Sequence, residues 1–146
     1  MRILYVINGF DPGGAEHGLL TLIRGGFFGE HELTVFGFCR GHGVLADEIA
    51  ASLPPNRLTL VSDNQELSLR ALLAGAAALF KILRADPPDL VVLSLKQANV
   101  IGRFVLMFFP GLRCASFEHN SQFHARRAGG LYRPVLRLLS VRVDEV

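Results

Sequence analysis

Apolar residues follow two kinds of pattern along the chain, continuous runs and helical spacing, and these patterns alternate. This indicates strands that alternate with helices. Continuous apolar runs between turn residues are typical of strands that are buried on both faces of a parallel sheet. Such runs predict strands at 3–7, 31–38, 57–61, 89–94 and 112–117, and a sixth strand that begins at 141–146. Apolar residues at helical spacing predict helices at 13–23, 44–53, 67–84 and 97–109, and a basic, apolar helix at 122–139.

This alternation predicts an α/β fold with a doubly wound, Rossmann-like and mostly parallel sheet flanked by helices. The run at 89–94 is apolar almost throughout, so we expect it to be a central strand. Ligands of such sheets bind at the carboxyl ends of the strands. A functional site is therefore expected in the loops that follow the strands.

The first of these loops places a pair of glycines at the start of a helix. Gly13 and Gly14 have no side chain that would keep an anion away from the backbone. The N–H groups of a helix start are unpaired and together carry roughly half a positive charge. The loop thus predicts a contact with the phosphate of a nucleotide or sugar nucleotide. A tight turn that needs glycine only for its dihedral angles explains the local pattern equally well.

The glycine loop differs from the two common phosphate-binding motifs. No Gly-Lys-Ser or Gly-Lys-Thr follows it, which excludes a nucleoside-triphosphatase P-loop, and its glycines do not form G-x-G-x-x-G. Glu16 would lie in the first helical turn, where a negative charge is favoured by about 0.3–1 kcal/mol. Contact with an acceptor hydroxyl is the alternative role of this carboxylate.

Three loops with suggestive chemistry follow the first, fourth and fifth predicted strands. They contain Gly13 and Gly14, then Ser94 to Lys96, then Glu118 to Asn120. Because the carboxyl ends of parallel strands share one edge of the sheet, we expect these loops to converge there.

The composition fits a single domain. The chain has 146 residues, is 50% hydrophobic and has a formal net charge of +2. This length supports a real core, and so small a charge gives no reason to expect a nucleic acid partner. No apolar run reaches the roughly 18 residues of a membrane span, and the N-terminus lacks the layout of a signal peptide. Two cysteines, Cys39 and Cys114, indicate buried thiols in a reduced cytoplasm rather than a disulfide framework.

His119 has several interpretations. A metal site is poorly supported, because His124 is five residues away and His31-Glu32 lacks the second histidine of H-E-x-x-H, so no metal is expected. As a general base, His119 has no evident carboxylate partner besides Glu118, whose side chain should point elsewhere on an extended chain. A hydrogen bond to a sugar and an ordinary loop histidine both remain open.

Several short motifs occur in a fixed order along the chain. Residues 1–7 lead into Pro-Gly-Gly-Ala-Glu at 12–16, and the later motifs are at 29–35, 43–49, 88–92 with Ala98, Asn99 and Gly102, 116–120 and 143–146. In this order they resemble the N-terminal half of a family 4 glycosyltransferase, a group of retaining enzymes with the two-domain GT-B fold. The likeness spans residues 1–146, with Glu30 as an extra residue. The family's C-terminal domain, with its paired glutamates, is missing, and the chain stops in an apolar run, so we expect a truncated protein.

The resemblance implies roles for the matching positions. Gly13 and Gly14 would face the diphosphate of a nucleotide-sugar donor, and His119 would be the catalytic residue beside the transferred sugar. The acceptor, a hydroxyl of a glycan, lipid or other cell-envelope precursor, would be contacted by a set of polar residues, namely Glu16, Ser94, Lys96, Asn99 and Asn120. No cofactor or metal is implied. The chain alone is expected to bind sugar nucleotides very weakly and to transfer no sugar, and its open half-cleft could self-associate.

Two further possibilities remain open. The segment 122–139 pairs arginines with apolar residues, so it is either a peripheral contact with the inner face of a membrane or a core helix with solvated arginines. The alternative class of function is a non-catalytic nucleotide-binding or receiver-like interaction module. For the acidic pocket and lysine of a receiver, only Asp11 and Lys96 are suitably placed.

Overall fold

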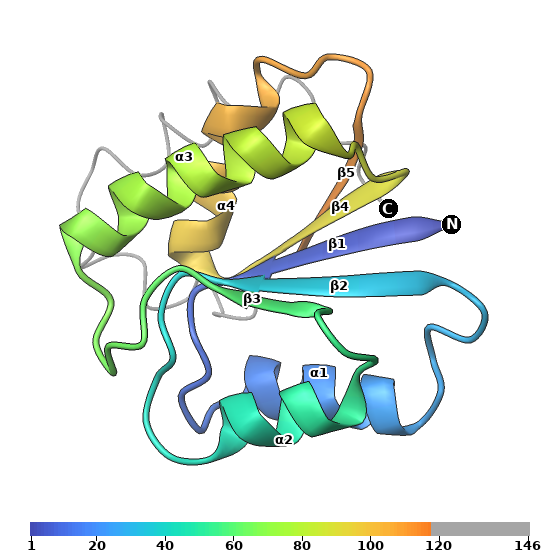
Figure 1. Ribbon diagram of the computed structural model, residues 1–146, viewed down its shortest axis with the longest axis vertical. Helices are drawn as coiled ribbons and strands as arrows, with labels where there is room; N and C mark the ends of the chain where they lie inside the picture. Colours follow the sequence, from blue (N-terminus) through green and yellow to red (C-terminus); the bar gives the residue numbers. More distant parts are fainter. Residues whose placement is uncertain (118–146) are drawn as a thin grey trace, which may run out of the picture.

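The sheet is five-stranded and parallel throughout, with the order β3-β2-β1-β4-β5 (Figure 1). The structure is a computed structural model that describes residues 1–117. Its strands are β1 (Arg2–Ile7), β2 (Glu32–Gly37), β3 (Leu58–Leu60), β4 (Leu90–Ser94) and β5 (Arg113–Phe117). Because all five strands point the same way, their following loops leave from one edge, which we call the carboxyl edge. The opposite edge is the amino edge.

Helices cover both faces of the sheet and form two layers (Figure 1). One layer contains α1 (Gly14–Arg24) and α2 (Leu45–Ser52), and the other contains α3 (Leu69–Ala85) and α4 (Lys96–Leu106). This is the doubly wound arrangement that the alternation of apolar patterns predicts, and it confirms the predicted fold class. Among residues 1–117, no helix has the length and apolar character that a membrane crossing requires.

Each predicted element within residues 1–117 is present, with ends displaced by a few residues. The largest difference is in α4, which ends at Leu106 rather than at 109 because the chain turns there, with Phe109 N–H bonding to the Leu106 carbonyl. The predicted helix at 122–139 and strand at 141–146 lie outside the described residues.

Two hydrophobic clusters, one on each face of the sheet, form the core. Strand β4 pairs with β1 and β5, and Val91 and Leu93 are fully buried, as expected for the central strand that the sequence predicts. Close helix packing depends on small residues. A Cβ on Gly75 would lie 2.2 Å from the Phe38 ring, and one on Gly102 would lie 2.3 Å from Leu93. The two helices therefore approach the sheet more closely than a larger side chain would allow.

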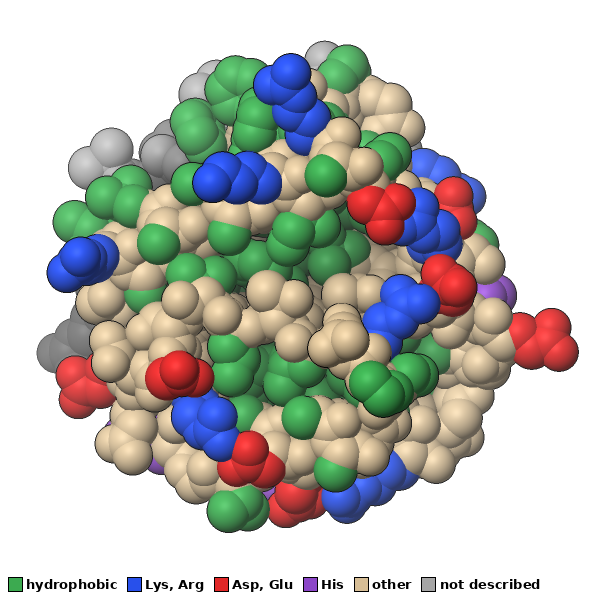
Figure 2. All heavy atoms as spheres, viewed as in Figure 1, with side chains coloured by type: hydrophobic (Ala, Val, Ile, Leu, Met, Phe, Trp, Pro, Cys, Tyr) green, Lys and Arg blue, Asp and Glu red, His purple; other side chains and the backbone are tan. Residues whose placement is uncertain are grey.

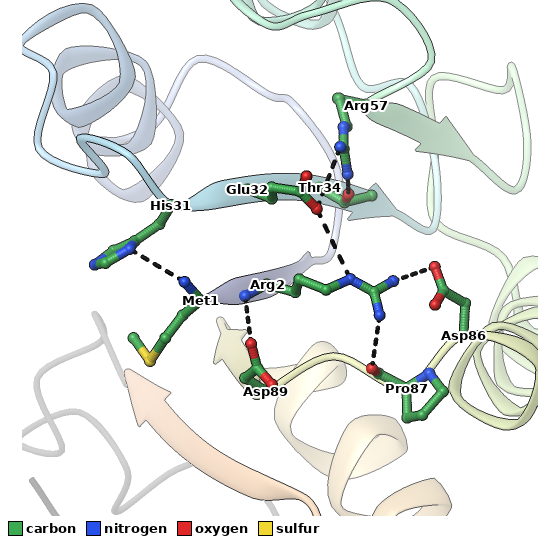
Figure 3. Close-up of polar contacts among 9 residues, drawn as sticks. All are labelled: Met1, Arg2, His31, Glu32, Thr34, Arg57, Asp86, Pro87 and Asp89. Atoms are coloured by element: carbon green, nitrogen blue, oxygen red, sulfur yellow. Dashed lines mark hydrogen bonds and ion pairs between the residues drawn. The ribbon is translucent and has the colours of Figure 1, made fainter.

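The amino edge is held together by charged side chains (Figure 3). The Arg2 guanidinium pairs with Asp86 and lies 3.8 Å from Glu32, which in turn lies 3.5 Å from Arg57. The Arg2 backbone N–H donates to Asp89 at 2.7 Å. These contacts connect the beginnings of β1, β2 and β4, and a hollow of about 100 Å³ lies among them. With acids and arginines matched in this way, the edge serves to join strands.

Candidate functional site

The glycine loop, residues 8–13, leaves the end of β1 at the carboxyl edge and is anchored at three points. Its first anchor is Asn8, whose side chain reaches the start of α4. Asn8 Oδ1 accepts from the Ala98 N–H at 2.7 Å, and Asn8 Nδ2 donates to Gln97 Oε1 at 2.5 Å. The asparagine thus caps a helix that begins nearly ninety residues later, and it ties the loop after β1 to the loop after β4.

The second anchor is close contact with the loop that follows β2. Phe10 is fully buried. Gly41 has φ +74, and a Cβ there would lie 2.5 Å from the Phe10 carbonyl carbon. A Cβ on Gly9 would likewise lie 2.5 Å from Cys39 Sγ. Burial raises the pKa of the Cys39 thiol, which keeps it protonated and unreactive. The two backbones therefore lie in direct contact, and the glycine loop has little room to move on this side.

The third anchor is a pair of polar residues at the outer rim. Asp11 Oδ1 accepts from the His42 backbone N–H at 2.8 Å and lies 2.7 Å from His42 Nδ1. Partial burial acts to raise the pKa of Asp11, but the two hydrogen bonds from His42 outweigh it, and the pKa lies below its usual value. Asp11 is thus held as a carboxylate that fixes the rim of the loop.

Between these anchors, the backbone is open where α1 begins. Gly13 is the N-cap residue and supplies no side-chain cap. Gly14 is exposed, and a Cβ built on it would meet no atom within 4 Å. The Gly13 carbonyl points along the helix, where it accepts from the backbone N–H of His17 at 3.1 Å and lies 2.9 Å from its Nδ1. The arrangement places an exposed glycine at the positive end of a helix, which is a geometry suited to an anion.

Glu16 is buried behind this opening, in the third position of α1. A Cβ on Gly13 would lie 2.5 Å from Glu16 Oε2, so the carboxylate is folded back against the helix start. A carboxylate in the first turn is stabilised by the helix dipole. With 7% of the residue exposed, Glu16 supports the loop from within. Its contact with an acceptor stays a prediction.

At the junction between the loop after β4 and α4, one residue has an unusual backbone conformation and the next carries a charge that is unusual at a helix start. Leu95 has φ 74 and ψ 166, a region that residues other than glycine adopt at a cost of about 1–3 kcal/mol. Lys96, the first residue of α4, places a cation at the positive end of the helix dipole. Both features are locally unfavourable, and such departures from local preference concentrate at functional sites.

Ser94 and Asn99, which the sequence predicts to contact the acceptor, are fully buried. Asn99 Nδ2 donates to the carbonyls of Leu95 at 2.8 Å and Phe117 at 3.3 Å, and its Oδ1 accepts from the Ser116 hydroxyl. The Ser94 hydroxyl makes no hydrogen bond within the described part of the chain. It does lie near the Tyr5 phenol, and burial raises the pKa of that phenol above its usual value although Ser94 acts to lower it. Asn99 holds the start of α4 against the end of β5. Acceptor contact by either residue stays a prediction.

Two of the predicted site loops therefore meet, and the third is not described. Asn8 joins the glycine loop to the loop that carries Lys96. His119 and Asn120 lie outside the described residues, so their predicted roles are not tested. Within residues 1–117, no group of histidine, cysteine, aspartate or glutamate side chains could hold a metal ion.

Sequence reasoning missed the residues that hold the site in place. Asn8 and Gln97 are far apart in the chain, and nothing local shows that they meet. The pairing of Asp11 with His42 is equally distant. One usable signal was the Gly-His-Gly turn at 41–43, because a glycine beside a predicted site loop can mark a close approach of two backbones.

No protein-family model matches the sequence, and no match to a curated protein was found. Solved structures do match the fold. The lipopolysaccharide outer core galactosyltransferase WaaB superposes with a TM-score of 0.61 at 17% identity, covering 94% of this chain and 37% of that one. S. aureus MnaA, in a structure with UDP, gives a TM-score of 0.62 at 13% identity, with coverage of 94% and 37%. The UDP-GlcNAc 2-epimerase of Methanocaldococcus jannaschii gives a TM-score of 0.60 at 14% identity, covering 95% of this chain and 37% of that one.

These likenesses define the fold. At identities this low, they are evidence for the fold alone. This chain spans well under half the length of the structures that it matches. The described sheet and its two helical layers have the architecture of one half of a GT-B protein.

Proposed function

We propose that this chain is the acceptor-binding half of a retaining glycosyltransferase that uses a nucleotide-sugar donor. In this role, the amides at Gly13 and Gly14 contact the donor diphosphate across a cleft, and a second domain supplies the opposite wall. The acceptor hydroxyl is placed against the anomeric carbon of the sugar by the loops after β4 and β5. Fixed amides then stabilise the charge that develops on the departing diphosphate.

The observation that carries the proposal is the open, rigid start of α1. Its exposed glycine lies at the edge where ligands of parallel sheets bind, and three anchors hold it before any ligand arrives. Donors that are fixed in advance need no reorganisation during the reaction, which makes them effective in catalysis. The fold likeness to nucleotide-sugar enzymes, one of them a galactosyltransferase, supports the same function.

The geometry also limits what the chain can bind alone. One charge-assisted hydrogen bond contributes roughly 1.5–3 kcal/mol, so two from the glycine loop contribute roughly 3–6 kcal/mol. Millimolar to micromolar binding requires about 4–8 kcal/mol after the cost of association has been met. The isolated chain should therefore bind UDP-sugars with a Kd of about 1 mM or weaker.

The contact is tested by following backbone amide signals by NMR while UDP-glucose or UDP-N-acetylglucosamine is added. We expect the signals of Gly14 and Ala15 to shift and to saturate only in the millimolar range. The variant Gly14→Asp fills the open space with a negative charge and should abolish these shifts. Gly18→Asp is the matched control, because Gly18 lies one turn further along α1 and also has open space beside it. Equal loss in both variants, or shifts confined to other loops, would refute the contact.

The reaction is tested with the complete protein that carries this domain. Transfer of the sugar to a hydroxyl acceptor with retained anomeric configuration, observed by NMR of the product, is the expected outcome. Epimerisation of the nucleotide sugar without an acceptor would instead indicate that the complete protein is an epimerase, like the epimerases of similar fold. Absence of both reactions and of nucleotide contact would favour the interaction module.

A further inference from the structure

The two helical layers differ in the charged residues that their helices contain. Helices α1 and α2 contain three acidic residues and one arginine, and that arginine, Arg24, is paired with Glu48 at 2.9 Å. Helices α3 and α4 contain no acidic residue and five cations, namely Arg70, Lys81, Arg84, Lys96 and Arg103. Each layer covers its own face of the sheet (Figure 1), so the difference in composition becomes a difference between two faces of the molecule.

The cations of α3 lie on the side that faces solvent. Arg70, Leu73, Lys81 and Arg84 are exposed and follow one another at spacings of three, eight and three residues, which places them on one helical stripe. In Figure 2, the surface over α3, at the top of the view, is green and blue, whereas red surface gathers over the lower helices and toward the amino edge. The stripe therefore combines positive charge with apolar surface.

Aromatic side chains continue this surface onto α4. Phe80 of α3 packs against Phe108 with ring centroids 5.9 Å apart, and Phe108 packs against Phe104 at 5.8 Å. Phe104 and Phe108 are nevertheless 51% and 60% exposed, and Leu73 is 64% exposed. Adjoining large apolar side chains that remain exposed in this way mark an interaction surface.

We propose that this surface, the α3/α4 face, docks on an anionic lipid bilayer. Its residues are Arg70, Leu73, Lys81, Arg84, Phe104 and Phe108. Exposed phenylalanine and leucine among lysine and arginine, without acidic residues, is the combination that places a helix in the interface of an anionic membrane. The inference does not depend on the glycosyltransferase proposal, because none of these residues belongs to the loops at the carboxyl edge.

The surrounding charges favour lipid over a second copy of the chain. Two identical cationic faces repel each other, which opposes a symmetric dimer through this surface. The acidic residues nearest in sequence to α3 are Asp63 and Glu66, in the loop before it, and Asp86 after it. Asp86 is paired with Arg2 at the amino edge, so it does not neutralise Lys81 or Arg84.

The test is sedimentation of the whole chain with vesicles of phosphatidylcholine that contain about 30 mol % phosphatidylglycerol. The chain should sediment with these vesicles at about 0.1 M salt, much less at about 0.5 M salt, and not with pure phosphatidylcholine. Lys81→Gln or Arg70→Gln should each lower the partition coefficient about fivefold, and Phe108→Ser should lower it about tenfold.

Matched substitutions on the opposite layer provide the controls. Phe27→Ser removes a phenylalanine that is 70% exposed in the turn after α1, and Arg24→Gln removes one cation of α1. Neither should change the sedimented fraction. Failure of the chain to sediment with the anionic vesicles overturns the inference. So does sedimentation that the α3/α4 variants leave unchanged, since the contact then lies elsewhere in the chain, such as in 122–139.

Discussion

The two edges of the sheet are stabilised by different means. At the amino edge, exposed charged side chains join the strands, and Arg2 and Asp86 are 41% and 69% exposed. At the carboxyl edge, a buried phenylalanine, close contacts at glycines and side-chain bonds to backbone groups fix the loops. Exposed ion pairs contribute little and are screened by salt, whereas buried packing and buried hydrogen bonds contribute more.

This difference in stabilisation indicates that the carboxyl edge, rather than the amino edge, is suited to bind a ligand. At the amino edge, each arginine is paired with a carboxylate of the same edge, so these charges are already neutralised within the protein. The carboxyl edge holds its backbone in place from behind and leaves Gly14, at the start of α1, exposed with open space beside it. A loop that is fixed from behind, and that keeps Gly14 exposed, can offer its helix start to another molecule. The following predictions test that contrast, beginning with the largest expected effect.

The close contact between Gly41 and Phe10 should be the most sensitive point of the carboxyl edge. Gly41→Ala introduces a Cβ 2.5 Å from backbone atoms at φ +74, and we expect it to lower the free energy of unfolding by about 3–5 kcal/mol. Gly43→Ala is the control, because Gly43 has φ +83 but open space around it, so only the backbone conformation should cost energy, about 1 kcal/mol. Urea unfolding measures both. Similar losses would show that the two loops are not in contact.

Removal of the Asn8 side chain should have the next largest effect. Asn8→Ala leaves the buried Ala98 N–H without a partner, and we expect a loss of about 1–3 kcal/mol in the free energy of unfolding. Ser68→Ala removes the side-chain cap of α3 in an exposed position and should cost about 1 kcal/mol. The nucleotide titration described above should also weaken in the Asn8 variant but not in the Ser68 variant. Unchanged titration in both would limit Asn8 to a structural role.

At the amino edge, the effects should be small and should depend on salt. Glu32→Gln weakens its contacts with Arg2 and Arg57, and we expect a loss of at most about 0.5 kcal/mol at low salt. That loss should disappear at about 0.5 M salt, because the charges are exposed. Glu30→Gln, at an exposed position without an ion pair among the described residues, provides the comparison. A large loss that persists at high salt would contradict the contrast between the edges.

The smallest effect concerns the Asp11 carboxyl at the rim of the glycine loop. Its pKa is lowered in the folded protein, so it contributes stability above its unfolded value of 3.8. That contribution is lost as the pH falls through the lower folded pKa. An NMR titration of Asp11 should therefore have its midpoint below 3.8, and His42→Ala should return the midpoint toward that value. A midpoint at or above 3.8 in the parent chain would show that His42 does not hold the carboxylate.

The sequence was informative where local pattern decides structure. The apolar run of β1 and the glycines after it predict both the strand and the start of α1, which begins at Gly14. The uninterrupted apolar character of β4 correctly indicates its interior position. The convergence of the loops after β1 and β4 followed from topology alone and is confirmed by the contacts of Asn8.

The remaining features depend on contacts between distant residues. Nothing near Asn8 shows that it caps α4, because the partner N–H belongs to residue 98. Nothing near Leu95 predicts its positive φ, since leucine rarely adopts that conformation without surrounding support. The predicted roles of His119 and Asn120, together with the cytoplasmic location and the extent of the domain, stay predictions.

The tether formed by Asn8 also has a chemical consequence. Asn8 precedes Gly9, and an asparagine followed by glycine is the sequence most prone to deamidation. The glycine nitrogen attacks the side-chain carbonyl carbon and expels the amide nitrogen as ammonia, and water then opens the cyclic imide to aspartate or isoaspartate. In the folded chain, both ends of that amide are bound to α4, which prevents the rotation that the attack requires. Folding thus protects Asn8 from deamidation. A preparation that has spent time unfolded should carry isoaspartate at position 8, and its contacts with the start of α4 should be weaker.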